Sequence, residues 1–195
     1  VTGEGLYSVV YANPPWQYDQ NATDEGMVSD SKYPTMSTEY LCALQIDRIT
    51  KPDAILFLWV PAPLIPDGLQ VLNAWGFKYV THAVWDKEVI GMGNTFKMQH
   101  EDLLVGRKGA YLTPQAEHRP ASVIREKWGE YNGKPEVFME YIERMYPTAV
   151  KVELFAMQHR AGWAVWNNQA DTCKIGNIVN TGSANEVDTG SHNAA

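Results

Sequence analysis

The residues of this chain best suited to chemistry form one short corner, Asn13-Pro14-Pro15-Trp16. The amide oxygen of Asn13 and the backbone carbonyl of Pro14 are acceptors that can take both hydrogens of an exocyclic amine. The indole of Trp16 can stack on the aromatic ring that carries such an amine. The corner therefore offers the groups needed to hold an aromatic amine in one orientation.

The chain before the corner explains why these acceptors are held rigidly. Residues 7–11 are apolar and β-branched and predict a buried strand. Two consecutive prolines cannot continue a strand, so the chain must leave the sheet at Asn13. Open α/β sheets bind their ligands at the carboxyl ends of their strands, which is where this corner falls. Taken alone, however, the four residues favour a structural turn, so the rest of the chain decides.

The composition is that of one globular domain. The chain has 195 residues, of which 45% are hydrophobic and 20% charged, enough for a single core of ordinary size. No apolar run could span a bilayer and no signal-peptide pattern is present, so we expect no membrane association. Cys42 and Cys173 lack metal-ligand spacing, which predicts no metal site and a reducing compartment, cytoplasmic or nuclear.

The net charge of −7 is unfavourable for a protein that holds nucleic acid by general electrostatics. Segment 107–134 differs, because its six basic and three acidic residues give it a net charge of +3. Its basic residues are Arg107, Lys108, Arg119, Arg125, Lys127 and Lys134. The segment is either a phosphate-binding surface or an ordinary solvated face, and the sequence leaves both open.

Hydrophobic patterning predicts alternating strands and helices. The continuous apolar run 54–60 predicts a central parallel strand buried on both faces, followed by a helix over 64–75 and a strand over 77–85. Residues 150–155 predict the last major strand, and 162–169 a closing edge element. This succession predicts βαβ units and an α/β fold with a mostly parallel sheet flanked by helices.

The last segment of the chain has a different composition. Residues 171–195 contain no aromatic side chain and are rich in Gly, Ser, Thr and Asn, which predicts a flexible tail. We therefore predict a catalytic or binding domain over 1–170 and a polar tail over 171–195.

Several segments together resemble one family, the D-P-P-W adenine-N6 methyltransferases, which use S-adenosylmethionine (SAM). Eukaryotic members of that family methylate adenosines in mRNA, and bacterial and phage members methylate adenine in DNA. The resemblance runs from residue 7 to residue 170. The matching segments are Asn13 to Trp16, the F-L-W-V strand at 57–60, the E-x-L-L-V-G strand at 101–106, Lys134-Pro135-Glu136, the E-L-F-A segment at 153–156, Gly162-Trp163 and Asn168-Gln169.

This resemblance implies a Rossmann-like SAM-dependent methyltransferase fold with a permuted motif order, in which the SAM-binding strand follows the catalytic corner. By the same match Lys134 meets the SAM carboxylate. Glu153 and Phe155 lie near the SAM sugar and backbone. The remaining cofactor contacts implied, to ribose and adenine, are His159, Asn168 and Gln169.

The chain departs from the family pattern at three positions. Asn13 stands where the family usually has Asp, Met157 where it often has Arg, and Asn167 where it has Gly. An amide can still accept from an amine without carrying a charge, and Asn occurs in related amino-methyltransferases. We therefore keep Asn13, Pro14, Pro15 and Trp16 as the candidate catalytic residues.

Three further residues are candidate substrate contacts, namely Tyr33, His100 and Arg119. Tyr33 could pack on a substrate ring or serve as an ordinary core tyrosine. His100 precedes the 101–106 strand, and a histidine in such a place is often a structural hydrogen-bonding group.

Two functions remain open from the sequence. The first is SAM-dependent methyl transfer to the N6 amine of adenine in DNA or RNA. That reaction needs placement, a polarised amine and a water-poor pocket more than proton transfer, because the sulfonium leaving group is already activated. The second is a non-catalytic subunit of the same fold that binds SAM or holds nucleic acid in a homo- or heterodimer.

Overall fold

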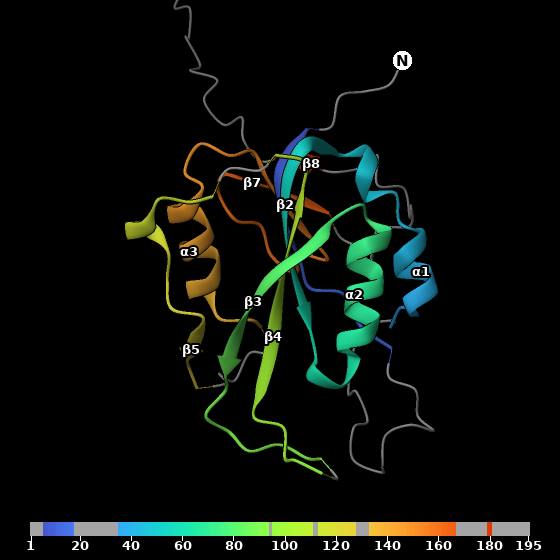
Figure 1. Cartoon of the computed structure of the whole chain (residues 1–195), viewed down its shortest axis with the longest axis vertical. Helices are drawn as coiled ribbons and strands as arrows, with labels where there is room; N and C mark the ends of the chain where they lie inside the picture. Colours follow the sequence, from blue (N-terminus) through green and yellow to red (C-terminus); the bar gives the residue numbers. More distant parts are fainter. Residues whose placement is uncertain are drawn as a thin grey trace, which may run out of the picture.

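A single twisted sheet forms the centre of the molecule (Figure 1). The computed structural model describes residues 6–17, 35–93, 95–110, 113–127, 133–166 and 179–180. Within them the sheet has eight strands in the order β5-β3-β4-β2-β1-β6-β7-β8. The strands are β1 Tyr7–Ala12, β2 Thr50–Val60, β3 Lys78–Asp86, β4 His100–Lys108, β5 Val123–Arg125, β6 Lys151–Leu154, β7 Trp163–Trp166 and β8 Val179–Asn180.

Parallel pairing dominates the part of the sheet that carries the Pro-Pro corner. Strand β1 lies between β2 and β6 and pairs in parallel with both, and β7 adds in parallel to β6. The side chains of β1 and of the second half of β2 are almost all buried, as their apolar, β-branched runs predict. The predicted mostly parallel sheet flanked by helices is confirmed.

The other half of the sheet corrects one expectation. Strand β2 is parallel to β1 but antiparallel to β4, so it is not a parallel strand on both sides. The crossover through the helix Ile65–Ala74 leaves one strand position between β2 and β3. The hairpin after β3 then brings β4 into that position. A hairpin partner is paired antiparallel whatever its composition, and the apolar run in β2 does not encode that choice.

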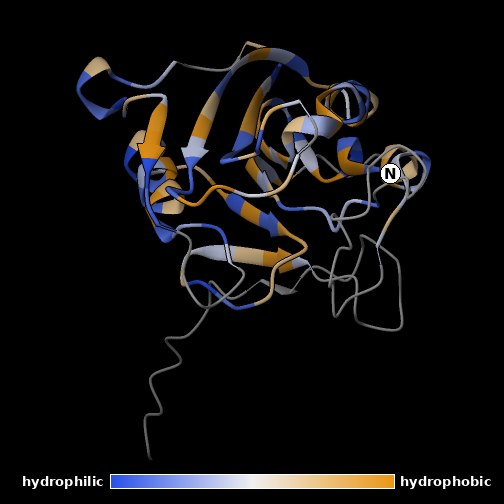
Figure 2. Ribbon diagram, turned by 90° about the horizontal axis from the view of Figure 1, so that it is seen from below, coloured by the Kyte–Doolittle hydropathy of each residue, from blue (hydrophilic) through white to orange (hydrophobic). Residues whose placement is uncertain are grey.

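Helices cover both faces of the sheet, with α1 and α2 on one face and α3 on the other (Figure 1). Helix α1 begins after Ser37, whose hydroxyl accepts from the amide of Tyr40 at 3.2 Å, so the helix is N-capped. Hydrophobic residues are most frequent on the strands between the two helical layers (Figure 2). The helices are α1 Thr38–Ala43, α2 Ile65–Ala74 and α3 Glu136–Met145, with short 3-10 turns at Ile46–Arg48, Ala62–Leu64 and Ala116–His118.

The strand register brings the carboxyl ends of three strands together on one side of the sheet. Ala12 pairs with Leu58 of β2 and with Leu154 of β6, so β1, β2 and β6 all end at the same edge. The amide of Asn13 donates to the Leu154 carbonyl at 3.4 Å as the chain leaves the sheet. The segments that follow these strands therefore start side by side, as the switch-point rule for open α/β sheets expects.

The sheet extends past the predicted closing edge. β8 pairs antiparallel with β7, so β7 is not an edge strand. The remainder of the predicted tail, 171–195, lies outside the described residues, and the proposed domain boundary at 170 stays a prediction. None of the helices in the described ranges combines the length and apolar character that crossing a membrane requires.

Close packing between α2 and β2 generates a stability prediction at Gly68. A Cβ added there would lie 2.6 and 2.8 Å from the two methyl carbons of Val60. We expect Gly68→Ala to destabilise the protein by about 1–3 kcal/mol through overpacking, although alanine favours a helix by about 1 kcal/mol. Urea denaturation measures the change.

Trimming the neighbour provides the matched control for this prediction. In the double variant Gly68→Ala/Val60→Ala, the added methyl occupies space that the valine vacates. The loss of stability should therefore be smaller than the sum of the two single losses. A stabilised Gly68→Ala single variant would show that this contact does not limit the packing.

Candidate active site

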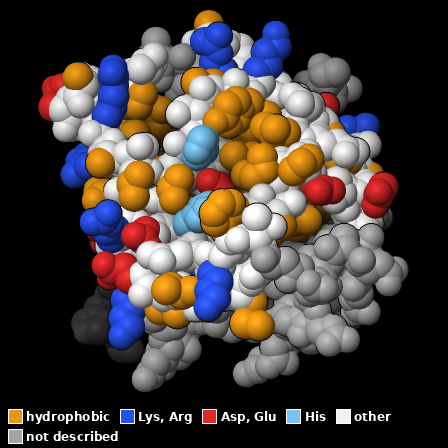
Figure 3. Space-filling model, turned by 60° about the horizontal axis from the view of Figure 1, so that its bottom comes forward, with side chains coloured by type: hydrophobic (Ala, Val, Ile, Leu, Met, Phe, Trp, Pro, Cys, Tyr) orange, Lys and Arg blue, Asp and Glu red, His pale blue; other side chains and the backbone are white. Residues whose placement is uncertain are grey.

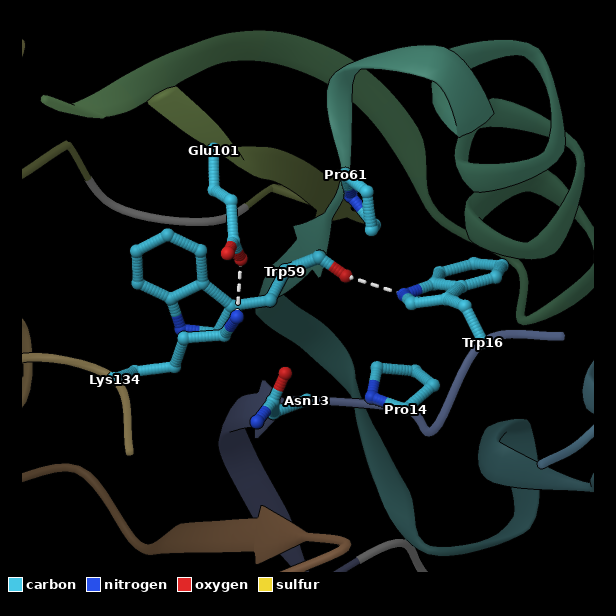
Figure 4. Close-up of a pocket in the computed structure, with 7 residues that line it drawn as sticks. All are labelled: Asn13, Pro14, Trp16, Trp59, Pro61, Glu101 and Lys134. Carbon is cyan, nitrogen blue, oxygen red and sulfur yellow. Dashed lines mark hydrogen bonds and ion pairs between the residues drawn. The ribbon is translucent and has the colours of Figure 1, made fainter. Parts of the chain in front are cut away.

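A cavity of about 150 Å³ opens beside the Pro-Pro corner (Figure 4). Its wall comes from neighbouring strands, because β1, β2 and β4 are adjacent in the sheet and the segment before α3 lies over their ends. A cavity of this size is smaller than typical pockets for drug-sized ligands, about 300–1,000 Å³, and would take only part of such a ligand. The lining residues are Asn13, Pro14, Trp16, Trp59, Pro61, Glu101 and Lys134.

Backbone hydrogen bonds hold the corner in shape. The amide of Trp16 donates to the Pro14 carbonyl at 2.9 Å, and the amide of Met36 donates to the Pro15 carbonyl at 2.8 Å. Pro14 lines the cavity, and its carbonyl has a second lone pair for a ligand. Pro15 is not among the lining residues, and its carbonyl serves the fold by tying the corner to Met36.

The Trp16 indole is a buried wall of the cavity. Its Nε1 donates to the backbone carbonyl of Trp59 at 2.8 Å, and the side chain is almost fully buried. In Figure 4 this ring lies on the far side of Pro14 from Lys134, with Pro61 above it. The hydrogen bond fixes the ring plane relative to β2, so Trp16 contributes a rigid apolar surface.

An ion pair stands opposite the corner. The Lys134 ammonium pairs with Glu101 Oε2, and Lys87 Nζ lies 3.4 Å from Glu101 Oε1. Burial raises the pKa of the Glu101 carboxyl, but the two lysines outweigh burial, so its pKa stays below the ordinary value and the group is ionised. The site thus combines one carboxylate with two ammonium groups.

Two tryptophans surround the Lys134 ammonium. Its Nζ lies 5.2 Å from the ring centroid of Trp59 and 5.9 Å from that of Trp85, both within the range of cation–π attraction. Trp59 is itself fixed, because its Nε1 donates to the Tyr11 hydroxyl at 2.7 Å. The ammonium is therefore held at a defined place, with Glu101 on one side and the cavity on the other.

Glu153 lies on β6, the strand beside β1. It is the register partner of Tyr11, and its carboxyl is mostly buried. Burial raises the pKa of Glu153 from 4.5 to about 7, and the nearby positive charge of Arg160 only partly opposes that rise. A carboxyl of this kind is well suited to accept hydrogen bonds from neutral donors such as hydroxyl groups.

The segment after β6 is anchored at two points. Phe155 has φ +64°, a left-handed conformation that is uncommon for a non-glycine residue, and its ring packs edge-on against Trp166 at 5.1 Å. Arg160 Nε and Nη2 donate to the two carboxylate oxygens of Glu143 at 2.7 and 3.1 Å. This bidentate pair ties the loop that carries the exposed His159 to α3, the helix that follows Lys134.

Two of the three predicted substrate contacts, His100 and Arg119, do not line the cavity. Because side chains alternate along a strand, His100 points to the face opposite Glu101, where its Nε2 lies 3.8 Å from Asp102. Arg119 lines an apolar groove against α3, and its Nε donates to the Pro114 carbonyl at 2.9 Å. Their role as substrate contacts stays a prediction. Three other predicted contacts lie outside the described residues, namely Tyr33, Asn168 and Gln169.

Three lining residues were not predicted as site residues, namely Trp59, Pro61 and Glu101. A signal existed for two of them, because Trp59 lies in the F-L-W-V strand and Glu101 opens the E-x-L-L-V-G strand. Their contribution depends on β4 lying beside β2, which patterning does not reveal. Within the described ranges, no group of three or more His, Cys, Asp or Glu side chains is placed to hold a metal ion.

Comparison with known proteins identifies relatives along nearly the whole chain. The family MT-A70 matches residues 7–169. Type II methyltransferase M.MunI from Mycoplasma sp is 34% identical over 186 residues, which cover 87% of this chain and 80% of that protein. N(6)-adenosine-methyltransferase MT-A70-like from Arabidopsis thaliana is 30% identical over 182 residues, covering 88% of this chain and 25% of that protein.

The human relative shows the same partial overlap. N(6)-adenosine-methyltransferase catalytic subunit METTL3 from Homo sapiens is 30% identical over 179 residues, covering 86% of this chain but 29% of that protein. The chain thus spans most of the Mycoplasma relative and about a quarter of the plant and human relatives. The family match extends from β1 through the last predicted cofactor contact, and the motif resemblance is confirmed: the chain belongs to the MT-A70 family.

Proposed function

We propose that this chain is a SAM-dependent methyltransferase that transfers a methyl group to the exocyclic N6 amine of adenine in nucleic acid. The observation that carries the proposal is that Asn13 and Pro14 line one small cavity together with the Lys134–Glu101 pair. Membership of the MT-A70 family supports the same reaction.

The residues present fit SAM. Lys134 offers a fixed ammonium for the carboxylate of the cofactor, and the mostly buried Glu153 offers an acceptor for its ribose hydroxyls. His159 stands in the loop between β6 and β7. We propose these three residues and Phe155 as cofactor contacts, together with the predicted Asn168 and Gln169. When bound, SAM supplies an activated methyl group on a positively charged sulfur.

The residues of the corner orient the amine. The amide oxygen of Asn13 and the Pro14 carbonyl accept its two hydrogens, which directs the nitrogen lone pair out of the ring plane. Trp16 and Pro61 provide rigid apolar walls that exclude water, so hydrogen bonds in the cavity are stronger than in solution. No general base is needed during transfer, because the amine nitrogen attacks as a neutral group and its proton is lost afterwards.

The nucleic acid itself is the open part of the substrate. We propose adenine in DNA or RNA, within the cytoplasm or the nucleus, since the base edge read at the corner is the same in both polymers. Incubation of the purified chain with isotopically labelled SAM and either DNA or RNA, followed by mass spectrometry of the nucleosides, identifies the polymer. Labelled N6-methyladenine in neither polymer would contradict the proposal.

One observation favours a second function. Asn13 carries no charge where the family usually has Asp, and a subunit without its own catalysis could retain the fold and bind SAM or nucleic acid for a partner copy or a different subunit. This alternative differs from the first in a measurable way, because it gives no turnover by the chain alone.

The first prediction concerns cofactor binding at Lys134. Lys134→Ala removes a charged hydrogen bond and should weaken SAM binding by about 1.5–3 kcal/mol. Isothermal titration calorimetry measures the difference. Lys127→Ala, which removes an exposed lysine from the same basic segment, should leave SAM affinity unchanged. Equal affinities for parent and Lys134→Ala would take Lys134 out of the cofactor site.

The second prediction concerns pH and stability at Glu153. The folded state keeps this carboxyl protonated up to about pH 7, whereas in the unfolded chain it ionises near its ordinary value of 4.5. Its contribution to stability is therefore complete below pH 4.5 and is lost as the pH rises through 7. Glu153→Gln abolishes this titration, so its melting temperature should fall less than that of the parent between these two pH values.

Other titrating groups are common to both proteins, so the difference between the two pH profiles isolates Glu153. Thermal melts recorded by circular dichroism across this interval provide the measurement. Parallel profiles for parent and Glu153→Gln would show that the carboxyl is ionised in the folded state.

The third prediction concerns the corner. Asn13→Ala should lower the methylation rate about a hundredfold or more, because it removes a preorganised group at the reacting centre. SAM affinity should stay close to that of the parent. Asn13→Asp should preserve or raise the rate, since a charged acceptor makes stronger hydrogen bonds.

The same variants separate the two functions. If the parent is inactive alone and Asn13→Asp methylates adenine, the chain is a partner subunit with a disabled corner. If Asn13→Ala methylates as fast as the parent, the corner is only a structural turn.

A further inference from the structure

A hairpin with an apolar tip projects from the edge of the sheet beside the cavity (Figure 1). It joins β3 to β4 over residues 87–99, of which Asn94 lies outside the described residues. Among the described residues, eleven large hydrophobic side chains are exposed, and four of them lie in this one loop. They are Val89, Ile90, Met92 and Phe96, with exposed fractions of 38%, 66%, 64% and 81%.

The hairpin is built to hold these side chains outward. The amide of Gly91 donates to the Met98 carbonyl at 2.8 Å, and the amide of Met98 donates to the Met92 carbonyl at 3.1 Å. A Cβ on Gly91 would lie only 2.7 Å from the Met98 oxygen, so this close backbone approach requires glycine. At the base, Asp86 Oδ1 accepts from Gln99 Nε2 at 2.7 Å. Hydrogen bonds within the hairpin therefore hold the backbone that carries these exposed apolar side chains.

The base of the hairpin is continuous with the active site. Lys87, its first residue, contacts Glu101, which lines the cavity next to Lys134. On its other side β5 pairs with β3, and Asp86 is the register partner of the well-exposed Arg125. Hydrophobic side chains gather on this end of the molecule, with basic side chains around them (Figure 3). The base of the hairpin thus lies between the cavity and the end of β5, which carries Arg125.

We propose that this tip, with Phe96 as its leading side chain, is a wedge that inserts between stacked bases of the nucleic-acid substrate and stabilises the target adenine outside the stack. The proposal rests on the proposed function and deepens it. A cavity of about 150 Å³ closed by Trp16 and Pro61 cannot admit a base that remains stacked in a strand. The place of an extruded base must be filled, and apolar side chains such as Phe, Met and Ile fill it in proteins that unstack nucleic acids.

Basic side chains near the hairpin are available to this occupant. Lys97 on the hairpin, and Arg125 and Lys127 at the end of β5 beside the hairpin base, are exposed basic side chains. The exposed Glu88 and Glu126 lie among them in the sequence, and Arg125 Nε lies 3.4 Å from Asp86. The three basic side chains are placed to meet phosphates on either side of an unstacked step, while the aromatic ring stacks on a base. A chain with a net charge of −7 needs such a local arrangement to hold a polyanion. A protein partner is the other conceivable occupant, and the test below distinguishes it.

The experiment uses the purified full chain and the adenine site first shown by mass spectrometry to be methylated. That adenine is replaced by 2-aminopurine in a DNA duplex and in a matching RNA, because 2-aminopurine fluorescence rises when the base leaves the stack. Phe96→Ala is compared with the parent and with Leu6→Ala. Leu6 is the matched control, since it is 63% exposed but precedes β1 at the opposite end of the strands.

We expect Phe96→Ala to lose most of the fluorescence rise and to bind the polymer about tenfold more weakly, as for loss of one base–aromatic stack. SAM affinity, which reports an intact cavity, should match that of the parent. Phe96→Trp should retain the fluorescence rise. On a substrate whose target adenine is mismatched, Phe96→Ala should methylate at nearly the parental rate, because less unstacking is required.

Three results would overturn the inference. If the parent methylates adenine and Phe96→Ala gives the same fluorescence rise, the tip does not act as a wedge, and the proposed function still holds. A change in oligomeric state for Phe96→Ala by light scattering, with nucleic-acid binding unchanged, assigns the tip to a protein partner. If the parent methylates no adenine in either polymer, both the proposed function and the wedge are rejected.

Discussion

Trp59 is the residue on which the site depends. Its backbone carbonyl accepts from the Trp16 indole, its own indole donates to Tyr11, and its ring attracts the Lys134 ammonium. It is fully buried, and Phe138 of α3 packs edge-on against its ring at 4.8 Å. One residue thus connects the corner after β1, the strand β2 and the start of α3. The geometry of the cavity is determined by core packing, which resists displacement far more strongly than a loop would.

The sheet topology makes this convergence possible. Strand β1 lies between β2 and β6 and pairs in parallel with both. Three adjacent strands therefore supply the two acceptors of the corner, the ring of Trp59 and the carboxyl of Glu153. The insertion of β4 beside β2 then adds Glu101 from a strand of opposite direction. The hairpin that makes this insertion also projects its apolar tip next to the cavity. One topological feature therefore contributes both the partner of Lys134 and the surface that we assign to nucleic acid.

Sequence reasoning succeeded where local rules determine structure. The apolar strand before the Pro-Pro corner, the helix expected over 64–75 and the strand expected over 77–85 follow from burial and hydrophobic patterning, and all three are present. It was less successful where the outcome depends on which strands pair. The position of β4 determines that Glu101 enters the cavity while His100, one residue earlier, points to the opposite face. Alternation alone shows that the two differ, but not which face holds the site.

The charge balance of the cavity gives a physical reason for the amide at position 13. Glu101 already places one carboxylate there, between two ammonium groups, so these three side chains carry one net positive charge. A second carboxylate at position 13 would accept more strongly from the amine but would cancel that positive charge. Asn13 keeps an acceptor oxygen at the corner without adding a negative charge. The retained positive charge is available to the carboxylate of a cofactor, and the amide oxygen still accepts a hydrogen bond from the amine.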